Sequence, residues 1–338
     1  MTGAVIGVGR MGRRHVRSLT DLGLEVVGIC DPKTESLQLT EVELGVPERR
    51  HYADPKAMLR DTRPECVVVS STADSHCDLT CLAAQHGAKY ILCEKPMACS
   101  IAQCDEMIAA CQNAGAHLSI NHPMRFMSYY VEPKRIMASE DFGGMTSMTV
   151  VGGNFGLAMN GTHYFEAFRF LTGEEPKEVT AWLSDVCVPN PRGPQFEDRG
   201  GSVRVTTGSG KRLYIEAWPD QGHRINVAYA GPFGQLVVDE LAGSMAMTVR
   251  EAEHRSQPTT RYGMPSIDKS KTAEPIDADL LYRTAIKSLL DGADYPTAQQ
   301  GKLAVRALVA AHISHARGNV SVDFNDETIP ADRMFAWA

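Results

Sequence analysis

The chain has 338 residues, of which 43% are hydrophobic and 22% charged, and its formal net charge at pH 7 is −7. This apolar fraction suffices for sizeable cores, which excludes a disordered chain, and the length corresponds to two ordinary domains. The acidic balance provides no broad basic surface. We therefore expect neither nucleic acid nor a membrane as a partner.

The N-terminus and the cysteines indicate a cytoplasmic protein. No positive charge precedes the first short apolar stretch, so it is not a signal peptide, and no window approaches the ~20 apolar residues of a membrane helix. Eight of the nine cysteines precede residue 112, and none forms a CxxC pair. Cys77 and Cys81, four apart, and Cys99 and Cys104, five apart, could belong to a metal site. Buried reduced thiols are the preferred interpretation, and no metal is predicted, because zinc sites usually show close paired spacing.

The first part of the chain alternates between short β-branched runs and helix-like stretches. Strands are expected at 4–8, 25–30, 66–70, 90–93 and 117–120, and helices near 12–22, 34–45, 75–87 and 100–114. Parallel strands need crossover connections, so this alternation predicts a parallel sheet with helices on both faces. Gly87 and Gly115 stand where helix C-caps are expected.

After about residue 143 the apolar period changes to two. Leu213 and Ile215, for example, alternate with Tyr214 and Glu216, which is typical of an antiparallel sheet with two unlike faces. Helices are expected at 162–172, with Gly173 as the C-cap, and near 278–291 and 297–317. The stretch 252–276, rich in Ser, Thr, Pro and Lys, is predicted to be a long exposed loop.

Gly7-Val8-Gly9-Arg10-Met11-Gly12 follows the first predicted strand and opens the first predicted helix, and Asp31 closes the second strand 19 residues after Gly12. In the dinucleotide fingerprint the first glycine permits the tight turn, the second lets the backbone approach the pyrophosphate, and the third lets helix and strand pack closely. The helix N-terminus then offers free N–H groups to the phosphates. We predict an NAD(P)-binding Rossmann domain over residues 1–122.

Asp31 favours NAD as the cofactor. A carboxylate there accepts hydrogen bonds from the adenosine ribose hydroxyls and repels a 2′-phosphate. The alternative is a surface acid in the Asp31-Pro32 turn. Lys33 could partly accommodate a phosphate, so NADP stays possible.

Several motifs narrow the function further. The fingerprint continues to His15 as GxGxxGxxH, and Thr72 with His76 comes next; Glu94-Lys95-Pro96 directly follows the strand 90–93. Asn121 through Arg125-Phe126 and Gly161-Thr162-His163, with Gly173 ten residues later, complete the set. On these motifs nearly the whole chain resembles the Gfo/Idh/MocA oxidoreductases, the family of glucose-fructose oxidoreductase and inositol dehydrogenase.

The resemblance implies a Rossmann domain followed by an α+β domain, residues 123–338, with an open, mainly antiparallel sheet and the substrate held between the domains. Packing of the last helices back on the first domain is one arrangement that we consider. Lys95 and His163 are the implied catalytic residues. The implied cofactor contacts are Gly7, Gly9, Arg10, Met11, Gly12, Asp31, Ser71, Thr72, His76, Glu94, Lys95 and Asn121. The implied substrate contacts are Lys95, Arg125, Asn160, His163 and Tyr164.

The chemistry of these groups suits hydride transfer. Removing hydride from an alcohol carbon requires loss of the hydroxyl proton, so an acid/base must sit beside C4 of the nicotinamide. Lys95 can serve if burial and the positive ring depress its pKa, and His163 could share the proton or fix the hydroxyl. Glu94 would orient Lys95 or contact the ribose. The alternatives are a solvated lysine and a histidine that only caps or packs. We expect a cis Lys95–Pro96 peptide bond.

One position departs from the family pattern. Many members carry an aspartate four residues before the helix histidine, where this chain has Met159 followed by Asn160. Asn160 can bind a hydroxyl but cannot relay a proton, so more of the acid/base work falls on Lys95 and His163. Arg125 could grip a substrate carboxylate or phosphate, or form a structural ion pair. Tyr164 could line a sugar pocket, although packing is the favoured interpretation.

We predict an NAD(P)-dependent dehydrogenase or reductase that acts on a hydroxyl or keto carbon of a sugar, polyol or sugar derivative. The alternatives are an NAD-dependent glycosidase of the same fold and a non-catalytic dinucleotide-binding regulator. Tyr214, Trp218 and Ala228 suggest an apolar outer sheet face, so a homodimer or homotetramer is expected. The segment 185–200 is long enough to cover the cleft.

Overall fold

The computed structural model describes the whole chain except residues 154, 223, 258–264 and 274. The chain divides into two compact units. The first comprises residues 1–123, 277–305 and 330–338, and the second comprises residues 124–276 and 306–329.

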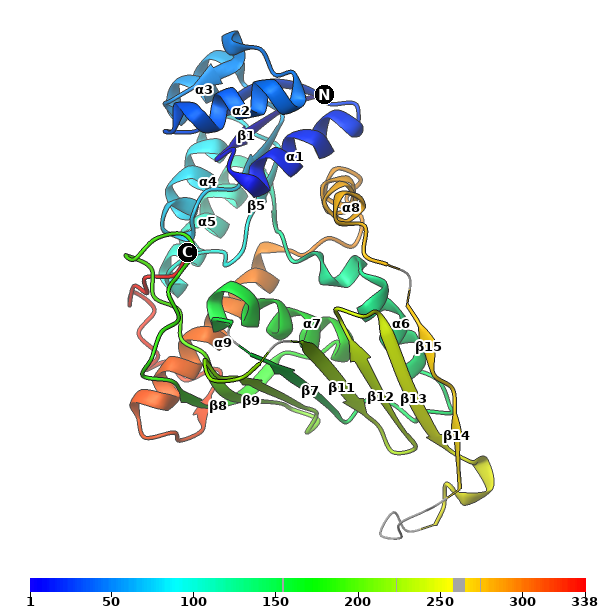
Figure 1. The fold of residues 1–338 in the computed structure, drawn as a ribbon. Coiled ribbons are helices and arrows are strands. Elements are labelled where there is room, and N and C mark those ends of the chain that lie inside the picture. The colour runs from blue at the N-terminus through cyan, green and yellow to red at the C-terminus, as the bar shows by residue number, and fades with distance from the viewer. Residues whose placement is uncertain (154, 223, 258–264, 274) are drawn as a thin grey trace. The chain divides into compact units, whose positions relative to one another are not determined.

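The first unit is built on a six-stranded parallel sheet in the order β3-β2-β1-β4-β5-β6. Figure 1 labels two of its strands, β1 and β5. Its strands are β1 (Thr2–Ile6), β2 (Glu25–Cys30), β3 (His51–Tyr52), β4 (Cys66–Val69), β5 (Tyr90–Cys93) and β6 (His117–Ile120). All four residues of β4 are buried, as expected for a parallel strand covered on both faces. The predicted Rossmann topology is confirmed, and the strand order reverses between β1 and β4, where such sheets bind ligands.

Six helices flank this sheet. They are α1 (Arg10–Asp21), α2 (Thr34–Leu44), α3 (Pro55–Thr62), α4 (His76–Gln85), α5 (Ile101–Ala114) and α8 (Ala278–Leu290). Ile286 and Leu289 of α8 lie fully buried in the same apolar core as Val16 and Leu19 of α1. Burial of each such side chain contributes about 1.5–3 kcal/mol to the stability of the fold. This burial holds α8 in the first unit, although α8 is far from α1 along the chain.

The element boundaries differ from the sequence prediction in a few places. β1 begins and ends two residues before the predicted 4–8, because Gly7 adopts a φ of +86° and already belongs to the turn. Gly115 is the left-handed C-cap of α5, whereas His86 is the C-cap of α4 and Gly87 follows it with positive φ. The short elements β3 and α3 were not predicted.

The second unit contains a mixed ten-stranded sheet in the order β14-β13-β12-β11-β7-β10-β9-β8-β16, with β15 also paired to β13 (Figure 1). Its strands are β7 (Ser147–Gly152), β8 (Pro176–Leu183), β9 (Gly201–Thr207), β10 (Arg212–Ala217), β11 (Ile225–Ala230), β12 (Gly234–Asp239), β13 (Ser244–Arg250), β14 (Ser266–Asp268), β15 (Lys271–Thr272) and β16 (Val322–Asp323). The pairs are antiparallel except β7 with β10, so the predicted mainly antiparallel sheet is confirmed.

The helices of this unit are α6 (Ser128–Met137), which was not predicted, and α7 (Thr162–Thr172), which matches its predicted bounds. A single π-helical turn, η4 (Leu157–Gly161), leads directly into α7. α6 and α7 pack against each other (Figure 1). α9 (Ala298–Ala316) contributes residues 298–305 to the first unit and 306–316 to the second. Short 3-10 turns complete the chain: η1 (Glu48–Arg50), η2 (Ala73–Ser75), η3 (Pro123–Phe126) and η5 (Ala252–His254).

The prediction of a loop over 252–276 was wrong in part. Among its described residues, η5 is a 3-10 turn, and β14 and β15 pair with the edge of β13. The polar composition of this stretch does not exclude strands, because β14 and β15 are short and exposed, and polar residues are common in edge strands.

Within the described part of the chain, no helix combines the length and apolarity that crossing a membrane requires. The cysteines are free thiols, and eight of the nine are buried.

Candidate functional site

The turn between β1 and α1 combines two glycines required by the fold with one that the fold leaves unexplained. A Cβ at Gly7 would lie 2.7 Å from the backbone nitrogen of Ser71, and a Cβ at Gly12 would lie 1.9 Å from the carbonyl oxygen of Gly7. A Cβ at Gly9 would meet nothing within 4 Å. Among the described residues no atom requires glycine there, so this position leaves open space beside the backbone, as the close approach of a pyrophosphate would need.

The N-terminus of α1 faces this turn with free donors. Gly9 is the N-cap residue, and no side chain caps the helix. Arg13 is the first residue whose N–H bonds within the helix, to the carbonyl oxygen of Gly9 at 3.0 Å. The N–H groups of Arg10, Met11 and Gly12 therefore have no intrahelical acceptor and, with the helix dipole, favour an anion.

Asp31 lies at the end of β2 and is attached to the same turn. Its Oδ2 accepts a hydrogen bond from the Val8 N–H at 2.9 Å, and its Oδ1 accepts one from the Lys33 N–H at 2.9 Å. The residue is buried, unlike a surface acid in a turn. Each oxygen keeps further lone-pair capacity, so the fixed carboxylate can still accept ribose hydroxyls.

Ser71, Thr72 and His76 shape the loop after β4. The Ser75 hydroxyl lies within hydrogen-bond distance of the Ser71 hydroxyl (2.7 Å) and the Thr72 carbonyl oxygen (2.9 Å). His76 is buried, with Nδ1 2.9 Å from the Pro96 carbonyl oxygen and Nε2 3.2 Å from that of Ser71. This geometry favours a role for His76 in holding two loops together.

Glu94 is the centre of a buried polar network at the end of β5. Its Oε1 lies 2.8 Å from both His15 Nε2 and Asn121 Nδ2, and its Oε2 accepts the Lys95 N–H at 3.3 Å. Burial by itself would raise the pKa of Glu94, but the hydrogen bond and charge of His15, with Lys95 and Asn121, outweigh burial and lower it to about 2. Glu94 is therefore ionised at neutral pH and fixes the backbone of Lys95.

The surroundings of this network extend to α8 and β6. The His15 ring packs edge-on against Tyr282, with ring centroids 5.1 Å apart. Asn121 follows β6, and its buried Oδ1 has no hydrogen-bond partner among the described residues. A buried acceptor without a partner is costly, so a donor from a bound molecule would stabilise it. The half-buried Lys95 precedes Pro96 through a cis peptide bond, as predicted.

These features of the first unit fit a nicotinamide dinucleotide. Gly9 leaves the space that the pyrophosphate needs, α1 offers uncapped N–H groups, and Asp31 presents a fixed carboxylate. Asn121 adds a buried acceptor for which the described residues provide no donor.

In the second unit, the π-helical turn carries Asn160 and leads to His163, the second residue of α7. Both residues are half-buried. Single π-helical turns often occur at functional sites, because they alter the direction of neighbouring side chains. The turn was not predicted, since its residues carry no motif beyond Gly161-Thr162-His163.

Asp198 is a residue that sequence reasoning missed. Its Oδ1 accepts the Ala158 N–H at 2.8 Å and its Oδ2 accepts the Met159 N–H at 2.7 Å, so it caps the π-helical turn. A Cβ at Gly156 would lie 1.9 Å from Asp198 Oδ2, so glycine permits this approach. The segment 185–200 thus brings a carboxylate to the backbone of Met159, the position where the family pattern has aspartate. The sequence did not predict this contact, because about 40 residues separate Asp198 from the π-helical turn.

Arg125 and Tyr164 are both buried, and their geometry favours the packing alternatives. The Arg125 side chain is 2% exposed and pairs with Glu166, which Arg169 also contacts at 3.0 Å. Tyr164 is 1% exposed, and its hydroxyl donates to Glu240 Oε2 at 3.0 Å. Substrate contact by either residue stays a prediction without support from these positions.

Half-buried Glu240 forms a cluster with buried tyrosines, among them the predicted site residue Tyr164. The Tyr130 hydroxyl also bonds to Glu240. Burial raises the pKa of Glu240, while the hydrogen bonds from Tyr130 and Tyr164 oppose this effect. The cluster connects the end of β12 to α6 and α7, which is a structural role.

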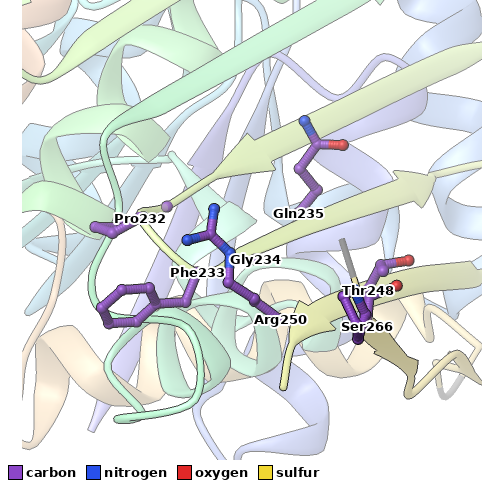
Figure 2. Close-up of a pocket in the computed structure, with 9 residues that line it drawn as sticks. Pro232, Phe233, Gly234, Gln235, Thr248, Arg250 and Ser266 are labelled. Carbon is purple, nitrogen blue, oxygen red and sulfur yellow. The ribbon is translucent and has the colours of Figure 1, made fainter. Parts of the chain in front are cut away.

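Figure 2 shows a hollow of about 300 Å³ in the second unit, at the turn between β11 and β12. Phe233 and Ser266 lie toward opposite ends, with Arg250 between them. The Arg250 guanidinium bonds to the carbonyl oxygens of Arg255 (3.3 Å) and Gln257 (3.1 Å), so it holds the segment after β13. None of the predicted site residues lines this hollow, and we assign it no role in catalysis.

A Rossmann sheet with this glycine turn, followed by a large open sheet, defines an NAD(P)-binding oxidoreductase of two units. A family model described as "Oxidoreductase family, NAD-binding Rossmann fold" matches residues 1–122. The chain is 30% identical to inositol 2-dehydrogenase of Salmonella paratyphi B over 257 residues, 71% of this chain and 74% of that enzyme. The protein belongs to the Gfo/Idh/MocA oxidoreductase family.

Other relatives are similar over different spans. D-apiose dehydrogenase of Paraburkholderia graminis is 32% identical over 196 residues, so the match spans 53% of this chain and about half, 52%, of that enzyme. An oxidoreductase from Agrobacterium radiobacter, solved with NAD+, L-tartaric acid and magnesium, has a TM-score of 0.78 at 18% identity over 96% of this chain and 98% of its own. Levoglucosan dehydrogenase, solved with NADH and levoglucosan, has a TM-score of 0.78 at 17% identity, with 96% and 100% covered. At such identities the solved structures support the fold alone.

Proposed function

We propose that this protein is an NAD-dependent dehydrogenase that transfers hydride between the nicotinamide and a hydroxyl-bearing carbon of a sugar, polyol or sugar derivative, with Lys95 and His163 as acid and base. The observation that carries the proposal is the ionised, buried Glu94, which fixes the Lys95 backbone in the unit that holds the dinucleotide turn. The names of the relatives, inositol and apiose dehydrogenases, support a polyhydroxylated substrate.

The preference for NAD over NADP rests on Asp31. Its carboxylate is held by two backbone N–H groups, so it cannot swing away from an incoming 2′-phosphate without losing both bonds. Repulsion between two anions in a partly buried site disfavours NADP. Lys33 donates to Asp31 through its backbone and leaves its exposed side chain in solvent, where charge screening weakens its effect.

In the proposed mechanism the glycine turn, the α1 N-terminus, Asp31, Ser71, Thr72 and Asn121 hold the dinucleotide. When bound, the nicotinamide supplies the hydride acceptor or donor. Lys95 Nζ takes the substrate hydroxyl proton during oxidation and returns it during reduction. Glu94 keeps the Lys95 backbone in place, and its anionic charge stabilises the protonated lysine after proton transfer.

His163 and Asn160 are proposed to bind the substrate from the second unit. His163 shares the hydroxyl proton or orients the hydroxyl, and Asn160 hydrogen-bonds a neighbouring hydroxyl. The residue that replaces the usual aspartate, Met159, cannot polarise either group. Asp198 holds the backbone of the turn that carries Asn160, so we propose it as a positioning residue for this part of the site.

Self-association through the ten-stranded sheet is part of the proposal. Val151, Trp182, Tyr214 and Val237 are exposed large apolar residues from β7, β8, β10 and β12. Alternating burial along β8 and β10 places Trp182 and Tyr214 opposite the buried side of the sheet. Such a surface favours pairing of identical copies. Light scattering at the mass of one chain would contradict this part.

A screen of sugars, polyols and uronic acids with NAD and NADP, followed at the nicotinamide absorbance band, tests the function. Lys95→Ala should retain NAD binding and lose most turnover. Lys89→Ala is the matched control, since that lysine is exposed at the same strand and pairs only loosely with Glu65, at 3.6 Å. An undiminished kcat in Lys95→Ala would refute the assigned role. Cleavage of a glycoside without net NADH would instead support the glycosidase alternative.

A further inference from the structure

Two thiols and a carboxylate meet between α4 and α5, outside the residues used above. Cys77 and Cys81 lie on α4, and Glu106 lies on α5. The two Sγ atoms and a carboxylate oxygen all lie within 4.8 Å of one another. The spacing of four residues places both thiols on one face of α4, and α5 packs against that helix (Figure 1).

We propose that Cys77, Cys81 and Glu106 bind one divalent cation of the zinc class. Two thiolates and a carboxylate form a ligand set that favours a borderline-soft ion over magnesium or calcium, which prefer oxygen ligands alone. In a tetrahedral site, ligand atoms lie about 3.5–3.8 Å apart. Side-chain rotations that move each ligand atom by about 1 Å would therefore bring the three atoms to the spacing that a bound ion requires.

Binding of the ion by these three side chains requires only the release of protons and no further reactant. Each thiol releases its proton to solvent as its sulfur forms a bond to the ion, and Glu106 enters as the carboxylate. Cys77 Sγ lies 3.6 Å from the Gln103 carbonyl oxygen, a weak bond whose loss costs little. Three protein ligands leave the fourth position of a tetrahedral ion to water, as in open zinc sites.

The burial of the three residues provides both shielding and access. Cys77 and Cys81 are 2% and 7% exposed, so the thiols lie below the surface. Glu106 is exposed and also lines a groove of about 630 Å³ between α4 and α5, whose wall includes Ala84, Ala109 and Ala110. An ion can therefore reach the carboxylate from solvent and then the thiols.

The other candidate group among the described residues lacks these properties. Glu251, Glu253 and His254 also lie within 4.8 Å of one another, but they are neighbours in one turn, and none is buried. They include no sulfur ligand, and clusters of exposed acidic groups are common without an ion. The thiol pair, its burial and the contribution of two helices distinguish the α4–α5 cluster.

Zinc binding to the full-length, reduced protein tests the proposal. The protein is dialysed against micromolar zinc with a phosphine reductant, and bound zinc is counted by elemental analysis. Cadmium is added separately to reveal thiolate-to-metal charge-transfer absorption. We expect a single ion per chain, loss of the ion in the variant carrying Cys77→Ser with Cys81→Ser, and a loss of affinity of at least about tenfold in Glu106→Gln.

Two controls match these variants. Asp105→Asn changes a neighbouring exposed acid, and Cys187→Ser changes a half-exposed thiol of the second unit, so both should bind zinc as the unchanged chain does. Because Glu106 is exposed, Glu106→Gln decides the question even if the cysteine variant fails to fold. Absence of bound zinc in the unchanged chain, full binding in Glu106→Gln, or a Cys77–Cys81 disulfide that persists under reduction would overturn the proposal.

Discussion

The glycine turn permits a sharp prediction, because two glycines of one motif should fail in opposite ways. Gly12→Ala should destabilise the fold, whereas Gly9→Ala should leave the fold intact and weaken cofactor binding. Both changes add one methyl group, and the two positions are three residues apart. They differ in what the methyl would meet, which is the Gly7 carbonyl oxygen in one case and open space in the other.

The magnitudes follow from these contacts. At Gly12 the methyl would lie 1.9 Å from an oxygen, far inside van der Waals contact, so backbone must move. Overpacking of this kind costs about 1–3 kcal/mol or more, and each kcal/mol lowers Tm by about 1–2 °C in a chain of 338 residues. At Gly9 the φ of −63° suits alanine. Loss of close backbone approach to a phosphate costs about 3 kcal/mol, which is ~100-fold in Kd.

Thermal unfolding with and without NAD measures both effects in one experiment. The unchanged chain should gain about 2.7 kcal/mol of stability at an NAD concentration of about one hundred times Kd. Without NAD, Gly9→Ala should unfold at the temperature of the unchanged chain. At the same NAD concentration it should gain only about 0.4 kcal/mol, because a ~100-fold weaker Kd brings that concentration close to the Kd of the variant. Gly12→Ala should unfold at a lower temperature under both conditions.

Either of two results would refute the reasoning. If Gly9→Ala binds NAD as tightly as the unchanged chain, the space at Gly9 is not where the pyrophosphate approaches. If Gly12→Ala unfolds at the unchanged temperature, the contact between α1 and the Gly7 carbonyl does not constrain the fold. Calorimetric titration of NAD into each variant checks the binding result independently of stability.

Three further predictions concern carboxylates. Asp31→Ser should raise the ratio of kcat/KM with NADP to that with NAD at least about tenfold, and an unchanged ratio would remove its assigned role. Asp198→Asn presents an amide N–H₂ to one of two backbone N–H groups that now donate to the carboxylate. Turnover should therefore fall and its pH profile should change, while the affinity for NAD stays the same. Asp185 is exposed in the same segment, and Asp185→Asn should change neither turnover nor its pH profile. Glu94 has a pKa of about 2 in the folded chain, against a usual 4.5. The ionised carboxylate therefore stabilises the fold by about 3 kcal/mol above pH 4.5, and this stabilisation is lost as the pH falls toward 2. Glu94→Gln should therefore be less stable than the unchanged chain in urea at pH 6, with a smaller difference at pH 3; an equal difference at both pH values would contradict the ionised network.

The sequence predicted the first unit well because its signals are local. Alternating strands and helices specify a parallel sheet, and the spacing from Gly7 to Asp31 predicts a cofactor-binding turn at the carboxyl end of the first strand. The weaker predictions were those for short or exposed elements. β3, α3 and the edge strands β14 and β15 have too few residues for a hydrophobic period to identify them.

The sequence alone determined which residues are candidates for the cofactor and catalytic sites, Lys95 and His163 among them, because they stand in motifs that resemble those of the family; their roles stay predictions. Contacts between distant segments were decided only by the tertiary structure. Glu94 meets His15 across 79 residues, and Asp198 reaches the turn at Met159 from a segment without a motif. Tertiary packing also decided that Arg125 and Tyr164 bond to the carboxylates of Glu166 and Glu240 and that Glu106 joins Cys77 and Cys81. No pattern along a chain encodes such pairings, since they arise where packed elements bring side chains within a few ångströms.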